Sequence, residues 1–115
     1  LKRAMNSYSR PGDWDFPGGN VLFGEPHDIS VTREIKEETG LDINNLHPIQ
    51  VISRYNEETK IYYLFINYRG KAGTEDVAVS NEHTEYKWVT REEFESLNPV
   101  DFMRETAMAA FDHLV

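Results

Sequence analysis

Residues 18–41 read GGNVLFGEPHDISVTREIKEETGL, a stretch in which regularly spaced glutamates lie between glycines. Pro26 suits the first turn of a helix, because the N–H that it lacks would have no partner there. Gly40 is a natural stop, since glycine readily adopts the left-handed conformation that ends a helix. The stretch therefore predicts a helix over residues 26–39.

Three carboxylates share one face of this predicted helix: Glu34, Glu37 and Glu38. They lie at positions i, i+3 and i+4, within an arc of about 100°. Like charges this close repel one another, so the cluster is unfavourable as a purely structural feature. A hard divalent cation removes the conflict, because Mg²⁺ accepts carboxylate oxygens and bridges substrate phosphates. The alternative is a solvated acidic helix in which Arg33 and Glu37 form an ordinary i,i+4 pair.

Arg33 lies roughly a quarter turn from the centre of the three carboxylates on the same helix. We therefore expect its side chain to point away from that centre. Its expected task is to hold Glu25, or a neighbouring acid, by charge-assisted hydrogen bonds rather than to contact a substrate.

The spacing of the fixed residues resembles the complete Nudix box of the Nudix, or MutT-like, hydrolases. That box reads G-x5-E-x7-R-E-U-x-E-E-x-G-U, where U is aliphatic, and every fixed position matches between Gly19 and Leu41. The resemblance implies an α/β fold with a mixed β-sheet sandwiched between α-helices, formed by a single domain over residues 1–115. The resemblance implies that only the tail of the family's first strand is present, at residues 1–5, before a loop at residues 6–15.

The resemblance also implies which residues perform the chemistry. A Mg²⁺ ion, with Mn²⁺ as a substitute, would be held by box carboxylates, a glycine carbonyl and an acid from a later loop: Glu34, Glu37, Glu38, Gly18 and Glu82. Glu34 is also the candidate general base, since a carboxylate among other acids is expected to hold its proton tightly until metal binds. The catalytic set is predicted to comprise these glutamates together with Arg33.

A second segment, NEHTEYKWV at residues 81–89, resembles a region found in several Nudix branches. Glu82 is the first candidate for the additional acid, and Glu85 is the second. His83 is expected either to contact phosphate or to hydrogen-bond the loop, and Trp88 to anchor a core strand. Trp14 is interpreted equally as a core-capping or a substrate-stacking aromatic residue.

The remaining pattern predicts five strands, one of them within the box, and two helices after the box. Strands are expected at residues 20–23, 46–55, 60–69, 76–79 and 86–89. The segment 60–69, KIYYLFINYR, is apolar on both alternating faces, which predicts a central strand covered on both sides. A capping box formed by Thr90 and Glu93 predicts a helix through Leu97. An amphipathic helix is expected over residues 100–114, with one apolar stripe formed by Met103, Ala107, Ala110 and Leu114.

Composition limits the classes of partner. The formal net charge of −8 argues against polymeric nucleic acid, because such binding needs a basic surface. A small polyphosphate stays compatible, since a bound metal inverts the field locally. No apolar run approaches the ~20 residues that cross a bilayer, and no signal-peptide pattern is present. The lack of cysteine, together with these features, is typical of a cytoplasmic protein.

The predicted activity is Mg²⁺-dependent hydrolysis of a nucleoside diphosphate linked to a further group. A (d)NTP, giving a nucleoside monophosphate and pyrophosphate, is the preferred substrate. Dinucleoside polyphosphates, ADP-ribose and nucleotide sugars are alternatives, as is a non-catalytic Nudix-like nucleotide sensor. The resemblance is also compatible with a homodimer, because a truncated first strand would expose a sheet edge.

Overall fold

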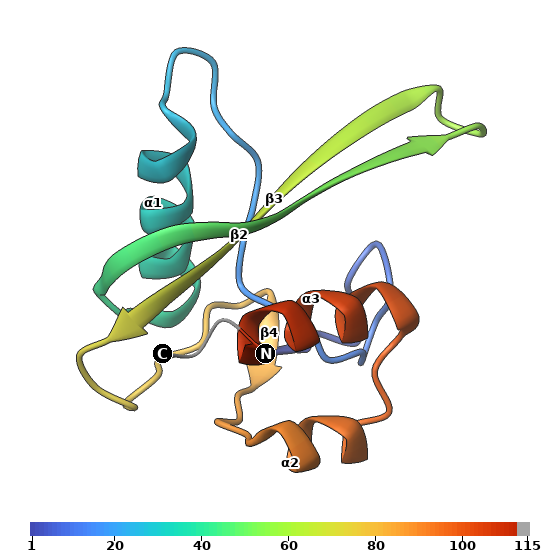
Figure 1. Ribbon diagram of the computed structural model, residues 1–115. Helices are drawn as coiled ribbons and strands as arrows, with labels where there is room; N and C mark the ends of the chain where they lie inside the picture. The colour runs from blue at the N-terminus through green and yellow to red at the C-terminus, as the bar shows by residue number, and fades with distance from the viewer. Residues whose placement is uncertain (113–115) are drawn as a thin grey trace.

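The computed structural model describes residues 1–112 and has an α/β fold (Figure 1). Its helices are α1 (His27–Thr39), α2 (Arg91–Ser96) and α3 (Asp101–Asp112). Its strands are β1 (Lys2–Arg3), β2 (Ile43–Asn56), β3 (Ile61–Ala72) and β4 (His83–Glu85). The α/β class is as expected. The strands form two separate antiparallel pairs, β1 with β4 and β2 with β3, and within residues 1–112 they do not join into one mixed sheet.

The hairpin of β2 and β3 is the longest element, and its strongly twisted ribbon passes α1 and α3 before its tip projects away (Figure 1). Both strands were predicted, but the expectation that residues 60–69 are covered on both sides is wrong. β3 pairs only with β2 in the described chain, and Tyr62 and Leu64 are 67% and 61% exposed. Aromatic and β-branched residues favour a strand, but they do not specify how many neighbours it has.

Three of the predicted strands, at residues 20–23, 76–79 and 86–89, are not strands in the structure. Their polar groups have other partners. The carbonyl of Asn20 accepts from the Arg33 side chain at 3.3 Å, and the N–H of Ala78 donates to the carbonyl of Thr39 at 2.9 Å. Pairing with the N-terminal strand occurs at residues 83–85 instead of residues 86–89.

The buried core lies where α2 and α3 pack together. Phe94, Met103 and Ala107 are buried, with Val89 and Leu97 packed against them. Met103 and Ala107 belong to the predicted apolar stripe of the last helix, whereas Leu114 lies outside the described residues.

The start of α2 follows the predicted capping box. The Thr90 hydroxyl accepts from the Glu93 N–H, and the Glu93 carboxylate accepts from the Thr90 N–H. The prediction that Trp88 lies in the core is wrong, because this residue is 48% exposed and its Nε1–H donates to the carbonyl of Glu75 at 2.9 Å. No helix within residues 1–112 is both long and apolar enough to span a membrane.

Candidate active site

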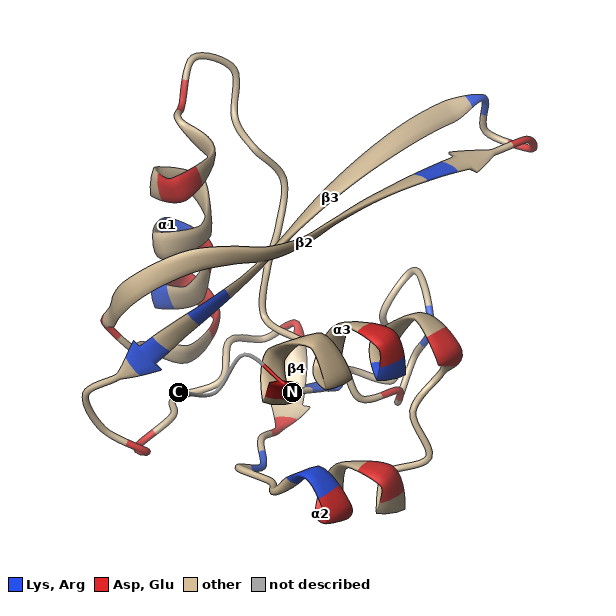
Figure 2. Cartoon of the chain, viewed as in Figure 1, with Lys and Arg blue, Asp and Glu red and all other residues tan. Residues whose placement is uncertain are grey.

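Helix α1 has nearly the bounds that the sequence predicts. Pro26 occupies its N-cap in an extended conformation, and Gly40 ends it with φ of 75° while its N–H donates to the carbonyl of Lys36. The box carboxylates lie at different depths: the residue Glu38 is 7% exposed, while the side chains of Glu34 and Glu37 are 18% and 58% exposed. Figure 2 shows acidic and basic residues interspersed along this helix. The helix therefore places a solvated acid, Glu37, directly beside a buried one, Glu38.

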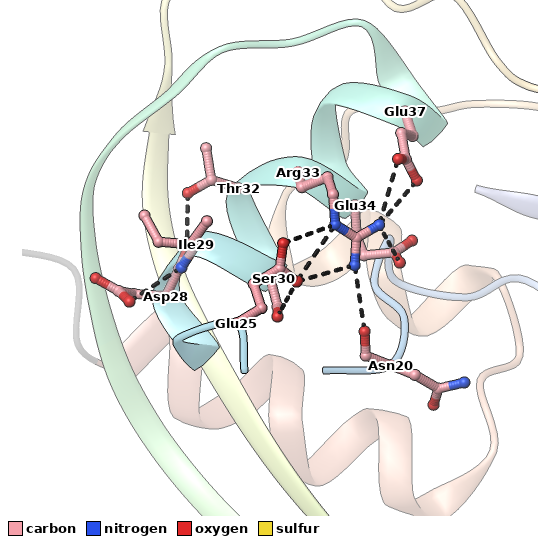
Figure 3. A network of polar contacts seen from close by, with 9 residues as sticks. All are labelled: Asn20, Glu25, Asp28, Ile29, Ser30, Thr32, Arg33, Glu34 and Glu37. Atoms are coloured by element: carbon pink, nitrogen blue, oxygen red, sulfur yellow. Dashed lines mark hydrogen bonds and ion pairs between the residues drawn. The ribbon is translucent and has the colours of Figure 1, made fainter. Parts of the chain in front are cut away.

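Arg33 lies at the centre of a network of acceptors, shown in Figure 3. Its Nε donates to Glu25 Oε2 at 3.1 Å, which is the expected pair. Its Nη1 also reaches Glu34 Oε1 at 2.8 Å and Glu37 Oε2 at 3.2 Å. The expectation that Arg33 points away from the carboxylates is therefore wrong, because its long side chain brings the guanidinium back across the helix surface.

This network sets the charge state of its members. The hydrogen bonds from Arg33, followed by that from Ser30, lower the pKa of Glu25 below its ordinary value. The pKa of Arg33 is raised in turn, with the hydrogen bonds to Glu25 and Glu34 as the main causes. A permanently charged guanidinium thus neutralises part of the acidic cluster and fixes the positions of its outer carboxylates.

The glycine bend at residues 18–19 packs directly against two of the box glutamates. The N–H of Gly18 donates to Glu38 Oε2 at 2.8 Å. A Cβ atom added to Gly19 would lie 2.3 Å from Cδ of Glu34. Glycine is required here because the Glu34 carboxylate occupies the space that a side chain would need.

We predict that Gly19→Ala will lower hydrolysis by about tenfold to 100-fold, the range found when groups that orient a site are removed. The new methyl group displaces the Glu34 carboxylate, which is the end of a flexible side chain, so the melting temperature should change little. Steady-state kinetics and thermal unfolding would check this. Gly73→Ala is the matched control, because nothing lies within 4 Å of a Cβ at that exposed position. Equal activity in both variants would contradict the assigned position of Glu34.

Glu38 is the acid whose protonation the structure alters most. Burial raises the pKa of Glu38 to about 7. The hydrogen bond from Gly18 acts in the opposite direction, and the charges of Glu34 and Glu82 raise the pKa further. A buried carboxylate with acidic neighbours is poorly stabilised without a cation, which is the electrostatic conflict that the sequence predicts.

The loop before β4 brings Glu82 to this carboxylate. The N–H of Ala78 donates to the carbonyl of Thr39 at 2.9 Å, and the N–H of Ser80 donates to the carbonyl of Glu38 at 3.3 Å. These two hydrogen bonds hold the loop against the last turn of α1. As a result, one potential ligand atom from each of Glu38, Glu82 and His83 lies within 4.8 Å of the others. Glu34 and Glu37 are not part of this group.

The second candidate acid, Glu85, does not join the group. It forms an ion pair with Lys2 at 3.4 Å on the small sheet, and its side chain is 54% exposed. Of the two loop acids, the structure therefore favours Glu82.

Sequence reasoning overlooked Asp15, whose charge also acts on Glu38. Its Oδ2 accepts from Arg3 and Arg10, each at 2.9 Å, and its backbone precedes the segment that leads into the glycine bend. An isolated aspartate in a turn-rich loop has no spacing pattern, so the sequence offered no signal for this position.

The group fits a divalent metal ion on the chemistry of its donors. Carboxylate oxygens are the ligands that Mg²⁺ and Mn²⁺ prefer, and the buried Glu38 needs a positive charge nearby. In addition, Nδ1 of His83 is buried without a hydrogen-bond partner in the described chain. An unpaired buried nitrogen beside two carboxylates is consistent with a position for a cation.

An apolar cavity of about 200 Å³ lies beside the site, and its walls include Pro17 and Thr39, the neighbours of Gly18 and Glu38. Trp14 lines this cavity, and the Lys87 ammonium lies 5.0 Å from the centre of its ring. Trp14 thus faces a cavity that the core residues Phe94 and Met103 also line, and both interpretations of Trp14 remain open.

Comparison with known proteins finds a matching family, similar sequences and a similar solved structure. The NUDIX domain family matches residues 1–111. The chain is 31% identical to the nucleoside triphosphatase NudI of Enterobacter sp. (strain 638), with 85% of this chain and 74% of that protein covered. It is 30% identical to the 8-oxo-dGTP diphosphatase of Buchnera aphidicola subsp. Schizaphis graminum, covering 74% of this chain and 62% of that protein. The structure resembles the MutT protein of Methanosarcina mazei Go1, with a TM-score of 0.75, 30% identity, and coverage of 92% and 76%.

Proposed function

Because the chain belongs to the Nudix family of hydrolases, which act on phosphoanhydride bonds of nucleotides, we propose that it is a divalent-metal-dependent nucleoside triphosphate pyrophosphohydrolase. The observation that carries this proposal is the buried Glu38, held by the glycine bend and grouped with Glu82. The products would be a nucleoside monophosphate and pyrophosphate.

The proposed metal ligands are the Gly18 carbonyl, Glu37, Glu38 and Glu82, with Glu34 contributing to the same centre. When bound, Mg²⁺ or Mn²⁺ would neutralise phosphate charge and lower the pKa of a water molecule. The support from this chain is its donor set, because the carboxylates of Glu38 and Glu82 come together near the end of α1. The backbone of Gly18 and Gly19 lies against Glu38 and Glu34.

Glu34 is proposed as the general base. Its carboxylate lies against the bare Cα of Gly19 and is held by Arg33 at 2.8 Å. In the reaction the water oxygen forms a bond to phosphorus, the phosphoanhydride bond breaks, and the water proton passes to Glu34. The pyrophosphate leaves with the electron pair of the broken bond. Arg33 acts as a positioning residue, because its donors already bind protein carboxylates.

Two features support a small nucleotide as substrate. The relatives named above include a nucleoside triphosphatase and an 8-oxo-dGTP diphosphatase. The cavity beside the site measures about 200 Å³, below the roughly 300–1,000 Å³ of pockets that enclose a whole ligand, so it suits a base better than a complete nucleotide. Dinucleoside polyphosphates, ADP-ribose and nucleotide sugars are the alternative substrates of the same chemistry.

We predict that the purified protein will convert at least one dNTP or oxidised dNTP to equimolar monophosphate and pyrophosphate when Mg²⁺ is present. The assay follows products by ³¹P NMR across dNTPs, oxidised dNTPs, dinucleoside polyphosphates, ADP-ribose and nucleotide sugars. EDTA should abolish turnover and weaken nucleotide binding, since the acidic cluster then repels phosphate. Faster cleavage of another substrate class would replace the triphosphate assignment. Binding without turnover over the whole panel would instead indicate a nucleotide sensor.

A further inference from the structure

His83 is a buried histidine whose side chain is incompletely paired. It begins β4, is 7% exposed, and its Nδ1 has no hydrogen-bond partner within residues 1–112. Buried polar side-chain atoms in proteins are mostly paired, so an exception requires an explanation such as an absent ion. Imidazole is the commonest metal ligand among protein side chains, which makes a cation the first explanation to consider.

The backbone around His83 is fixed from two sides. The N–H of His83 donates to the carbonyl of Ser80 at 3.2 Å, and the residue pairs with Arg3 in the small sheet. The preceding Glu82 is held as well, because its carbonyl accepts from the N–H of Ala4 at 2.9 Å. The imidazole is thus held close to Glu82 and Glu38 by the fold rather than by its own hydrogen bonds.

The separation of the three side chains suits a shared ion. One ligand atom from each of Glu38, Glu82 and His83 lies within 4.8 Å of the others. Two ligands at about 2.1 Å from one ion lie up to about 4.2 Å apart, so only a small adjustment of the side chains is needed. The exposed Glu82 side chain has the freedom to make that adjustment.

We propose that His83 supplies a nitrogen ligand to a divalent cation bound by Glu38 and Glu82, and that this ligand favours transition-metal ions over Mg²⁺. The inference rests on the proposed function, because it concerns the same metal centre. Mg²⁺ prefers an all-oxygen shell, whereas Mn²⁺, Co²⁺ and Ni²⁺ accept imidazole with increasing affinity. Replacing one oxygen donor by imidazole therefore changes which ion the centre selects.

The test measures metal binding in the full chain, without substrate. Mn²⁺, Co²⁺ and Mg²⁺ are each titrated by calorimetry into the wild type and into His83→Gln, and electron spin-echo spectroscopy of the Mn²⁺-loaded protein detects a coordinated ¹⁴N. We expect a ¹⁴N signal in the wild type that His83→Gln abolishes. We also expect Co²⁺ affinity to fall at least about tenfold in this variant, while Mg²⁺ affinity changes less.

His47→Gln is the matched control, since His47 is an exposed histidine on β2 outside the ligand group, and it should retain the ¹⁴N signal. The wild-type spectrum alone decides the case if His83→Gln does not fold. Mn²⁺ binding without ¹⁴N coupling, or an equal loss of affinity for all three ions, would overturn the role of His83 while leaving the pyrophosphohydrolase proposal intact. Absence of Mn²⁺ binding together with absence of hydrolysis would overturn both.

Discussion

Glu38→Gln is expected to reduce metal-dependent hydrolysis by at least about 100-fold, the upper range for groups that only orient a metal centre. The carboxylate is buried at the point where the glycine bend and the loop before β4 meet, so an amide in its place removes one charge from the ligand group. The amide oxygen of glutamine can still accept from the N–H of Gly18. The fold should therefore persist while the affinity for divalent cations falls.

The same substitution should alter stability in a manner that depends on pH. The pKa of Glu38 is about 7 in the folded protein and near 4.5 for an ordinary carboxyl group, so folding favours the protonated form. Without metal, the contribution of Glu38 to the free energy of unfolding is therefore largest below pH 4.5. It falls as the pH rises through 7, because the buried carboxyl group must then lose its proton.

Glutamine carries no charge, so this dependence should disappear in the variant. Metal-free Glu38→Gln is expected to melt higher than the wild type at pH 8 and close to it at pH 5. Excess Mg²⁺ should stabilise the wild type at pH 8 and have little effect on the variant. Thermal unfolding and hydrolysis assays would measure these effects, with Glu58→Gln in the exposed β2–β3 turn as control. Undiminished hydrolysis by Glu38→Gln would exclude this residue as a ligand.

Arg33→Ala is expected to have the second-largest effect, with hydrolysis lowered by about 10- to 100-fold. The substitution removes the donors shared by Glu25, Glu34 and Glu37, so these carboxylates repel one another and the position of Glu34 is lost. The metal-free protein should also melt at a lower temperature. Arg33→Lys should recover only part of the activity, because an ammonium group cannot bind several carboxylates in the fixed geometry of a guanidinium.

A matched control is Arg91→Ala, which removes an exposed arginine paired with Asp112 at the surface. Arg91 also lies over the Phe111 ring at 5.3 Å, so its loss should lower the melting temperature somewhat, while hydrolysis stays near the wild-type value. Steady-state kinetics would show the loss for Arg33→Ala mainly in kcat. A change in KM alone would indicate that Arg33 binds substrate and would contradict its role in positioning Glu34.

The parts of the fold that local chemistry determines could be predicted from the sequence. The bounds of α1 follow from Pro26 and Gly40, and the start of α2 follows from the reciprocal hydrogen bonds of Thr90 and Glu93. The closeness of Glu38 to the glycine bend was also expected, because the spacing resembles that of a known motif.

The remaining features depend on contacts that no local pattern encodes. The exposure of Tyr62 follows from the number of strands beside β3, which is a property of the whole sheet. Arg33 bends back to Glu34 and Glu37 because its side chain is long, and a helical projection of Cβ directions ignores that length. The burial of the His83 nitrogen without a partner depends on the hydrogen bonds that hold the loop against α1, and these bonds join residues far apart in the sequence.

The ligand group brings together residues more than forty positions apart along the chain, Glu38 at the end of α1 and Glu82 with His83 around the start of β4. Glu38 is therefore synthesised more than forty residues before the other two donors of the group. Until then, the acidic turn of α1 lacks the partners that the loop before β4 brings to it. The metal centre that we propose can therefore be complete only after β4 has paired with β1.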